Sequence, residues 1–200
     1  MHHFVQKIYK ANVDLYNKAK SPLKSHGPDH HWRVYKHAVR LAEKLKITYD
    51  AEVLAAACLL HDLAAYYPEK TGERYHEFDY ALAGKVLRKI RFPKAKISTV
   101  LTAIAHHGSD PKYRRSKEQI ETILLRDADK MDVFGPLGVA RIIMVRTLKG
   151  DTLQGIVKDF YTQGHLKRKW DSITTKEAKA LCRKDYQYSL EFFRKLSGVI

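Results

Sequence analysis

DAEVLAAACLLHDLAAYY, residues 50–67, is the most apolar helical stretch of this sequence. Asp50 suits a helix cap, Glu52 falls in the first turn, and the apolar residues after them recur at helical spacing. Alanines fill much of the stretch, which is typical of a helix that neighbours pack against on several sides. The segment predicts a central helix that ends around Tyr66-Tyr67, because a residue before proline disfavours helix.

Helical periodicity continues on both sides of this stretch. A helix begins at Pro28 and carries an apolar stripe over residues 34–45. Pro136 suits a first helical position and Asp151 a helix cap. Further helices are expected over residues 3–18, 76–90, 95–106, 117–131, 136–148, 151–162 and 174–197. Since no run of alternating β-branched residues predicts a strand, the expected fold is all-α, a single-domain helical bundle over residues 1–200.

The composition excludes several classes of protein. Lys and Arg number 37 and Asp and Glu 22, which gives a formal net charge of +15 over 200 residues, 44% of them hydrophobic. That hydrophobic share excludes wholesale disorder, and two distant cysteines exclude a zinc finger or a disulfide scaffold. No apolar run reaches the roughly 18 residues that span a bilayer, and the first residues do not form a secretory signal. We therefore expect a cytoplasmic protein without membrane contact.

The basic excess is concentrated in one region. Between Gly84 and Lys117, ten basic residues stand against Asp110 alone, which is +9 of the total charge. Such a field attracts phosphate groups on a small ligand, a nucleic-acid backbone or an acidic partner. An ordinary solvated surface is the alternative interpretation.

Polar residues at three places are candidates for a metal site. His61-Asp62 ends the central stretch, and such a pair beside an apolar core is costly to bury unless it is paired or metal-bound. Divalent ions take at least four donors, so further residues are needed. Asp29-His30, at the start of its helix, is one source. The segment RDADKMD (126–132) offers three carboxylates after apolar residues, although an ordinary charged helix end has the same pattern.

Three motifs containing these residues follow one another along the chain. They are HGPDHHWRV (26–34), AAACLLHDLA (55–64) and LLRDADKMDVFGPLGVAR (124–141). In this order they resemble the HD-domain superfamily of metal-dependent phosphohydrolases, in the form of its small bacterial and archaeal nucleotide-hydrolysing members. The resemblance covers residues 26–146 and implies an all-α fold on which the helices of 151–197 pack. It implies four metal ligands, His30, His61, Asp62 and Asp129.

The resemblance implies hydrolysis of a phosphorylated small molecule, most simply a nucleotide, by a phosphomonoesterase or pyrophosphohydrolase. Mixed imidazole and carboxylate donors suit Mn, Fe, Co, Ni or Zn better than Mg. Such an ion lowers the pKa of bound water, and nearby cations offset the charge of the transition state. The expected catalytic residues are Arg33, Lys130 and His106. The expected substrate-binding residues are His26, Arg126, Lys112, Arg114 and Arg115.

Other histidines are weighed by position. The resemblance implies a second metal ion or a substrate phosphate at His106 or His107, and an interaction with the helix dipole is the alternative. His37 lies about 10.5 Å along the helix from His30 and cannot share one ion with it. His31 is expected to face solvent.

One position departs from the family pattern. Many HD hydrolases carry Glu or Asp three or four residues after the motif aspartate, where this chain has Ala65 and Tyr66, which do not transfer protons at neutral pH. The candidate replacements are Glu69, Glu73, Glu77 and His106. The departure leaves open a catalytically silent binder of metal or nucleotide.

Two further questions stay open at this point. The charge of +15, with aromatic residues among the basic ones, leaves a nucleic-acid-binding or nucleic-acid-cleaving HD protein as the alternative function. The apolar side of the C-terminal helix either closes the core of a monomer or serves a homodimer.

Overall fold

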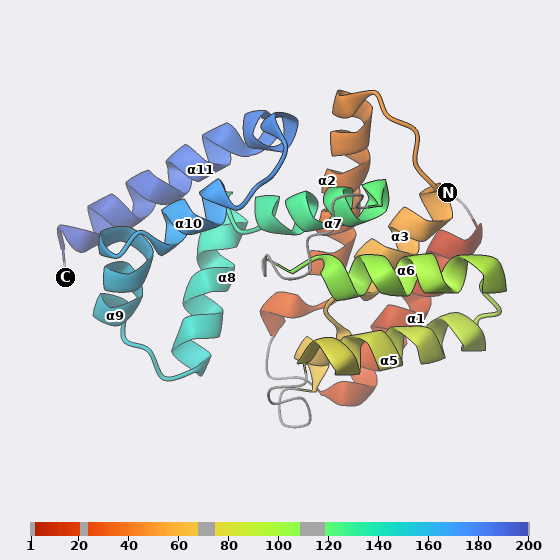
Figure 1. The fold of residues 1–200 in the computed structure, drawn as a ribbon. Coiled ribbons are helices and arrows are strands. Elements are labelled where there is room, and N and C mark those ends of the chain that lie inside the picture. Colours follow the sequence, from red (N-terminus) through yellow and green to blue (C-terminus); the bar gives the residue numbers. More distant parts are fainter. Residues whose placement is uncertain (1–2, 21–23, 68–74, 109–118, 200) are drawn as a thin grey trace. The chain divides into compact units, whose positions relative to one another are not determined.

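The computed structural model describes residues 3–20, 24–67, 75–108 and 119–199 (Figure 1). Within those ranges the secondary structure is helical and no strand occurs, so the predicted all-α class is confirmed. The chain divides into two compact units, Met1–Arg126 and Asp127–Ile200. The single-domain bundle stays a prediction. No helix in the described ranges is long and apolar enough to cross a membrane.

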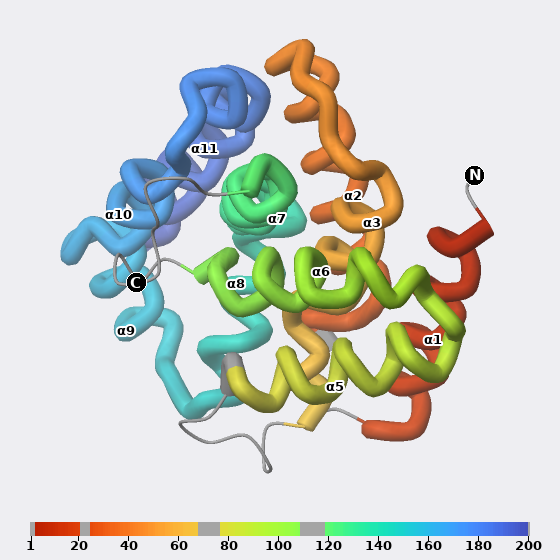
Figure 2. Tube along the Cα trace, turned by 45° about the vertical axis from the view of Figure 1, so that its right-hand side comes forward, coloured from red at the N-terminus to blue at the C-terminus, as the bar shows by residue number. Residues whose placement is uncertain are grey.

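The helices follow one another as Figure 2 traces them, from red to blue. The first unit contains α1 (His3–Ala19), the 3-10 turn η1 (Lys24–His26), α2 (Pro28–Leu45), α3 (Ala51–Leu60), the 3-10 turn η2 (Leu63–Tyr66), α5 (Tyr75–Lys89), α6 (Lys94–His106) and the first half of α7 (Ile120–Met131). The second unit contains the rest of α7, α8 (Gly135–Leu148), α9 (Leu153–Val157), the π-helical segment η5 (Lys158–Thr162), α10 (His165–Asp171) and α11 (Lys176–Ser197).

α3 is the buried centre of the first unit. Every residue from Val53 to Leu60 is buried, and α1, α2 and α6 all contact this helix. The Asp50 carboxylate caps it by accepting the backbone N–H groups of Glu52 and Val53. Lys96 of α6 pairs with Asp50 at 2.8 Å and with Glu52 at 2.7 Å. The cap that begins α3 therefore also holds the neighbouring helix.

α3 ends at Leu60, earlier than the expected end around Tyr66, and the chain turns into η2. In a continued helix, the N–H of Ala64 would bond to the carbonyl of Leu60. It donates instead to the carboxyl group of Asp79 on α5, at 2.5 Å. The expected extension was wrong because this hydrogen bond comes from a residue fifteen positions away, which local periodicity does not register.

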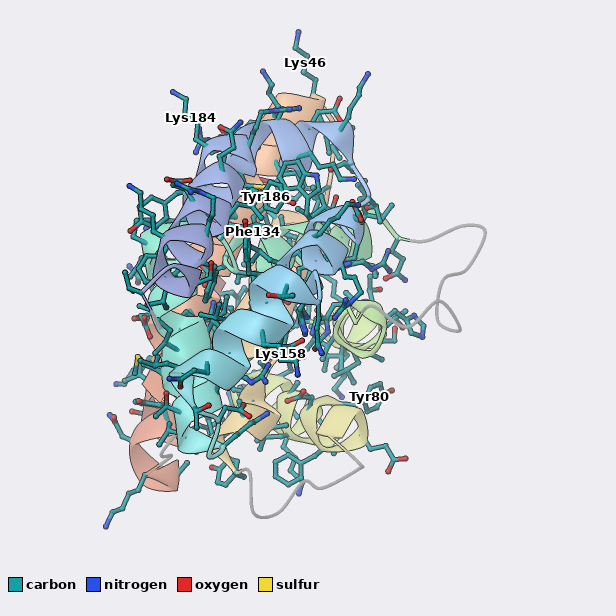
Figure 3. All side chains as sticks on the ribbon, turned by 90° about the vertical axis from the view of Figure 1, so that its left-hand side faces the viewer. Lys46, Tyr80, Phe134, Lys158, Lys184 and Tyr186 are labelled. Atoms are coloured by element: carbon teal, nitrogen blue, oxygen red, sulfur yellow. The ribbon has the colours of Figure 1, made fainter. Side chains whose placement is uncertain are left out.

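Aromatic rings fill the space between α10 and α11 in the second unit. Trp170 and Tyr186 stack with centroids 4.3 Å apart, and Phe134 meets Tyr186 edge-on at 5.3 Å (Figure 3). Gly135, which starts α8, has a φ of +79°, and a Cβ there would lie 2.8 Å from the Asp185 carboxylate. Only glycine fits both this backbone and this close approach.

One expected boundary of the second unit differs. Thr152 caps α9 in place of Asp151, since its hydroxyl accepts the N–H of Gly155 at 3.1 Å. The carboxylate of Asp151 pairs instead with Arg146 of α8. The single helix expected over 151–162 is divided into α9 and η5.

Candidate active site

Three of the four predicted metal ligands lie together in the first unit. His30 comes from the first turn of α2, and His61 and Asp62 follow the last residue of α3. Each offers one ligand atom within 4.8 Å of those of the other two. Both imidazoles are fully buried, with ring centroids 5.2 Å apart. Two imidazoles and a carboxylate that converge in this way fit a divalent transition metal, whose charge offsets the cost of burying the carboxylate.

A hydrogen bond to the preceding helix turn fixes the orientation of His61. Its Nδ1 lies 2.9 Å from the carbonyl of Cys58, and because a carbonyl only accepts, Nδ1 carries the proton. The lone pair is then on Nε2, which lies 3.7 Å from Oδ2 of Asp62. Histidines that bind metals use this same arrangement, with the second ring nitrogen donating to a carbonyl or carboxylate. The early end of α3 thus leaves His61 in an orientation that suits a metal ligand.

His107 approaches the cluster from the end of α6. Its Nδ1 donates to the carbonyl of Ile104 at 2.5 Å, and its Nε2 lies 3.6 Å from Oδ1 of Asp62. Burial raises the pKa of Asp62, but His61 and His107 outweigh burial and hold that pKa well below its usual range. The Asp62 carboxylate is therefore ionised. Of the two histidines considered for a second ion or a phosphate, His107 is the one whose ring lies beside Asp62.

His31 is fully buried, so the expectation that it faces solvent was wrong. Its Nδ1 lies 3.2 Å from the carbonyl of Gly27 and 3.1 Å from the hydroxyl of Tyr66, since η2 covers the first turn of α2. Burial, followed by the neighbouring rings of His61 and His30, lowers the pKa of His31 well below its usual value. The ring is therefore neutral, and it packs against His61 with centroids 4.9 Å apart.

Tyr66, one of the two residues at the position of the missing acid, has a structural role. Its hydroxyl donates to Oδ1 of Asn12 at 2.6 Å, and the Asn12 amide donates to the carbonyl of Leu59 at 2.5 Å. Burial raises the pKa of the Tyr66 hydroxyl above its usual value. This buried network joins α1, the end of α3 and η2, and it keeps the Tyr66 proton out of reach of acid–base chemistry at neutral pH.

A buried carboxyl group that the sequence analysis missed lies behind the motif. Asp79 of α5 is fully buried and holds the N–H of Ala64, two residues after Asp62. Burial, and then the charge of Asp62, raises the pKa of Asp79 to about 9, so the group is protonated at neutral pH. Its position was a signal, because Asp79 precedes the buried Ala83 and Leu87 by one and two helical turns. A carboxyl group on the apolar stripe of a helix is costly to bury, so a specific partner or role is expected for it.

Of the glutamates considered as replacements for the missing acid, only Glu77 lies among the described residues. Glu77 of α5 is exposed. Glu69 and Glu73 lie outside the described residues. His106, the fourth candidate, is half-buried at the end of α6.

Two of the three carboxylates in the third motif have structural partners within the second unit. Asp127 accepts hydrogen bonds from the backbone N–H groups and hydroxyls of Thr174 and Thr175. Asp132 pairs with Arg141. Asp129, the predicted ligand, lies between them on α7.

Two of the predicted substrate-handling residues belong to the start of α2 or the turn before it. Arg33 pairs with Asp29, one turn earlier, at 2.7 Å. The ring of His26, in η1, lies 5.5 Å from that of His30, and its Nδ1 lies 3.0 Å from the hydroxyl of Ser25. His26 is therefore beside His30, as a residue that contacts substrate or supports a predicted ligand requires.

The remaining predicted cations are distributed over both units. Arg126 is buried and donates to the carbonyl of His106 at 3.0 Å. Lys130 donates to the carbonyl of Ser172 at 2.7 Å, within the second unit. Three predicted phosphate contacts lie outside the described residues, namely Lys112, Arg114 and Arg115.

The helical fold and the His-Asp cluster define a metal-dependent phosphohydrolase of the HD type. The family model for the HD domain matches residues 29–134, more than half of the chain. This chain therefore belongs to the HD-domain family, as its three motifs predict.

Known relatives match nearly the whole chain. The uncharacterized protein YpgQ of Bacillus subtilis is 27% identical over 190 residues, covering 88% of this chain and 87% of YpgQ. The crystal structure of YpgQ in complex with ADP is similar with a TM-score of 0.67 and 25% identity, covering 94% of this chain and 96% of that one. A protein from Lactobacillus plantarum (TM-score 0.75, 20% identity, 99% and 97% covered) and an HD-superfamily hydrolase from Bacillus thuringiensis (0.64, 23%, 96% and 95%) share the fold.

Proposed function

We propose that this chain hydrolyses nucleotides, or similar phosphorylated small molecules, with a divalent transition metal, as a phosphomonoesterase or pyrophosphohydrolase. The observation that carries the proposal is the convergence of His30, His61 and Asp62 at the buried end of α3. The tautomer of His61 supports it, because the Cys58 carbonyl leaves Nε2 as the donor atom.

Asp129 is the proposed fourth ligand. It follows Arg126 by three residues on α7, about one helical turn, so the two side chains leave the helix on similar sides. Arg126 donates to the carbonyl of His106, next to His107, whose ring lies beside Asp62. The other acids of the motif, Asp127 and Asp132, are bound to Thr174, Thr175 and Arg141. Asp129 is the carboxylate that the third motif of the HD family implies as a ligand, and the hydrogen bonds of Asp127 and Asp132 are consistent with that proposal.

Two His and two Asp balance the charge of a divalent ion, and Mn, Fe, Co, Ni or Zn suits these donors better than Mg. When bound, such an ion lowers the pKa of a bound water and polarises a phosphoryl oxygen. Asp62 supplies a carboxylate ligand that stays ionised, because its pKa lies well below the usual range. In the proposal, Arg33, Lys130 and His106 offset the charge that develops on phosphorus, and His107 contacts a phosphate or a second ion.

A nucleotide is the favoured substrate for two reasons. The net charge of +15 attracts phosphate groups, and the relative YpgQ has been crystallised with ADP. Substrate contacts are proposed for His26 and Arg126, beside His30 and His106, and for the loop residues Lys112, Arg114 and Arg115. A panel of nucleoside mono-, di- and triphosphates therefore comes before generic phosphate esters.

The test combines metal analysis with turnover. Purified protein is expected to hold a stoichiometric transition metal and to hydrolyse at least one nucleotide, whereas His61→Ala and Asp62→Ala lose both. His37→Ala is the matched control, because His37 lies on the same helix as His30 but about 10.5 Å further along it. Metal content and hydrolysis that survive in both cluster variants would place the activity elsewhere.

The same panel of nucleotides distinguishes a catalytically silent binder from an enzyme. Ala65 and Tyr66 at the position of the usual acid favour that alternative, and the Tyr66 hydroxyl is bound to Asn12. A nucleotide that raises the unfolding temperature of the metal-loaded protein without being hydrolysed would establish it.

A further inference from the structure

A cationic groove of the first unit is lined by α1 and by the end of α5 with the two residues after it, and the two helices contact each other. Its volume is about 520 Å³, inside the range of roughly 300–1,000 Å³ typical of small-molecule sites. Five basic side chains and one acidic side chain line it, a local charge of +4. They are Lys7, Lys10, Lys18, Lys89, Arg91 and Asp14.

The basic row on α1 follows helical spacing. Lys7, Lys10 and Lys18 stand three and then eight residues apart, which puts them on one face, while the opposite face buries Val5 and Ile8 in the core. Eleven residues of helix span about 16.5 Å. A row of that length can meet several adjacent phosphates at once.

These cations lack acidic partners. In the parts of the chain that the structure describes, none of the five forms an ion pair, although Asp14 lines the same groove. Elsewhere the chain does pair its cations, as Lys96 does with Asp50 and Glu52. A helix dipole accounts for basic residues in a last turn but not for Lys7 and Lys10, which lie in the first half of α1. Lys7 lies 5.9 Å from the centre of the Phe4 ring, but no ion pair within the described residues neutralises the five cations, so their charge is available to an anionic ligand.

Arg91 occupies a backbone position where glycine is the usual residue. It follows α5 with a φ of +58°, and the N–H of Phe92 bonds back to the carbonyl of Leu87 at 2.9 Å. This is a helix C-terminal motif in which glycine avoids the strain that a side chain brings. An arginine there costs stability and places a cation at the end of the groove.

The floor of the groove is apolar and carries no aromatic ring among the described residues. Leu15, Val86 and Ile90 form it together with Ala11. An aliphatic floor suits one flat apolar body, whereas single-stranded nucleic acid is usually bound on stacked aromatic side chains.

We propose that this groove binds a nucleoside polyphosphate, with the phosphates on the row of cations and the base on the aliphatic floor. The site lies on the α1–α5 side of the unit and uses none of the residues assigned to catalysis, so it goes beyond the proposed function and serves as a second, effector-type nucleotide site.

Calorimetric titration with ATP in the presence of EDTA tests this on the full chain. Lys10→Glu/Lys89→Glu is expected to weaken ATP binding at least tenfold. Lys36→Glu/Lys44→Glu, which reverses two exposed charges on α2, is expected to change it less than about threefold. Equal losses in both double variants would show a bulk-charge effect and overturn the proposal, as would no loss in the groove variant.

Arg91→Gly and Lys46→Gly form a second matched pair. Lys46 ends α2 with a φ of +54° but does not line the groove. Both changes remove one charge and relieve the same strain, so both are expected to raise the unfolding temperature, by about 2–4 °C. Only Arg91→Gly is expected to weaken ATP binding. A groove that prefers a single-stranded oligonucleotide over ATP, or equal ATP affinity in the two glycine variants, would refute the assignment.

Discussion

The His-Asp cluster is proposed to bind a metal cation and the α1–α5 groove an anionic ligand, and the two sites are built in opposite ways. In and around the cluster, hydrogen bonds to the backbone orient the polar side chains: the carbonyl of Cys58 accepts from His61 in the cluster, the carbonyl of Ile104 accepts from His107 beside it, and the N–H of Ala64 donates to Asp79 behind it. In the groove, five exposed cations stand without ion-pair partners in the described part of the chain. Side-chain geometry is therefore fixed where chemistry needs one atom in one place, whereas charge alone suffices where a flexible anion is to be attracted.

Removing one proposed metal ligand is the strongest test of whether the cluster and the groove are separate sites. His30→Ala is expected to lower metal affinity and hydrolysis by more than about 100-fold, since even changes behind metal ligands cost 10–100-fold. The same variant is expected to keep its ATP affinity in EDTA, while Lys10→Glu/Lys89→Glu shows the reverse pattern. If His30→Ala also abolishes ATP binding without metal, the two regions are one site.

Substitutions of Asp79 test whether the turn after His61-Asp62 needs the hydrogen bond between the Ala64 N–H and this buried carboxyl group. Asp79→Ala removes the acceptor of the Ala64 N–H and is expected to lower metal affinity about 10–100-fold and stability by about 1–3 kcal/mol. Asp79→Asn keeps an acceptor of the same shape and is expected to recover most of the metal affinity. Metal titration of the two variants decides, and equal losses would argue against a positioning role.

Asp79 also predicts a pH effect of defined sign. Its pKa is raised to about 9 in the folded protein from 3.8, so between these values the folded state holds a proton that the unfolded chain releases. The contribution is fully present below about pH 4 and is lost as the pH rises toward 9. The stability of the natural protein relative to Asp79→Asn is therefore expected to fall between about pH 5 and pH 8 in urea unfolding. A constant difference over that range would contradict the raised pKa.

Tyr66→Phe is expected to have a smaller effect on metal affinity than Asp79→Ala. It leaves Oδ1 of the buried Asn12 without its donor and is expected to cost about 1–3 kcal/mol of stability. Metal affinity is expected to change only a few-fold, because the ligands themselves keep their hydrogen bonds. Tyr188→Phe, at an exposed site, is the control for loss of a hydroxyl.

A change in salt concentration is expected to have the smallest effect of these tests on the two regions. Raising NaCl from about 0.05 to 0.5 M is expected to weaken ATP binding in the groove several-fold, because exposed charges are screened over a shorter Debye length. Metal content is expected to stay the same, since the cluster is buried. Salt-independent ATP affinity would show that the cations of the groove do not carry the binding.

The sequence predicted well what depends on local pattern. Periodicity over residues 50–60 identified α3 and its Asp50 cap, and the three motifs identified the HD family and a ligand set of which three members lie together. Residue patterns did not indicate the burial of His31, and for Asp79 they offered only its place on the apolar stripe of α5, without its hydrogen-bond partner. Both depend on contacts between residues far apart in the chain, with Tyr66 in one case and Ala64 in the other.

The amino-acid sequence alone determined that this protein is helical, that α3 is its most apolar element, and that imidazoles and carboxylates stand at helix ends suited to a metal. Tertiary structure alone decided where α3 stops, which ring nitrogen of His61 carries a proton, and which cations keep their charge unpaired. The reason is physical. Helical periodicity is a property of neighbours along the chain, whereas burial and hydrogen bonding to distant groups exist only once the helices have packed.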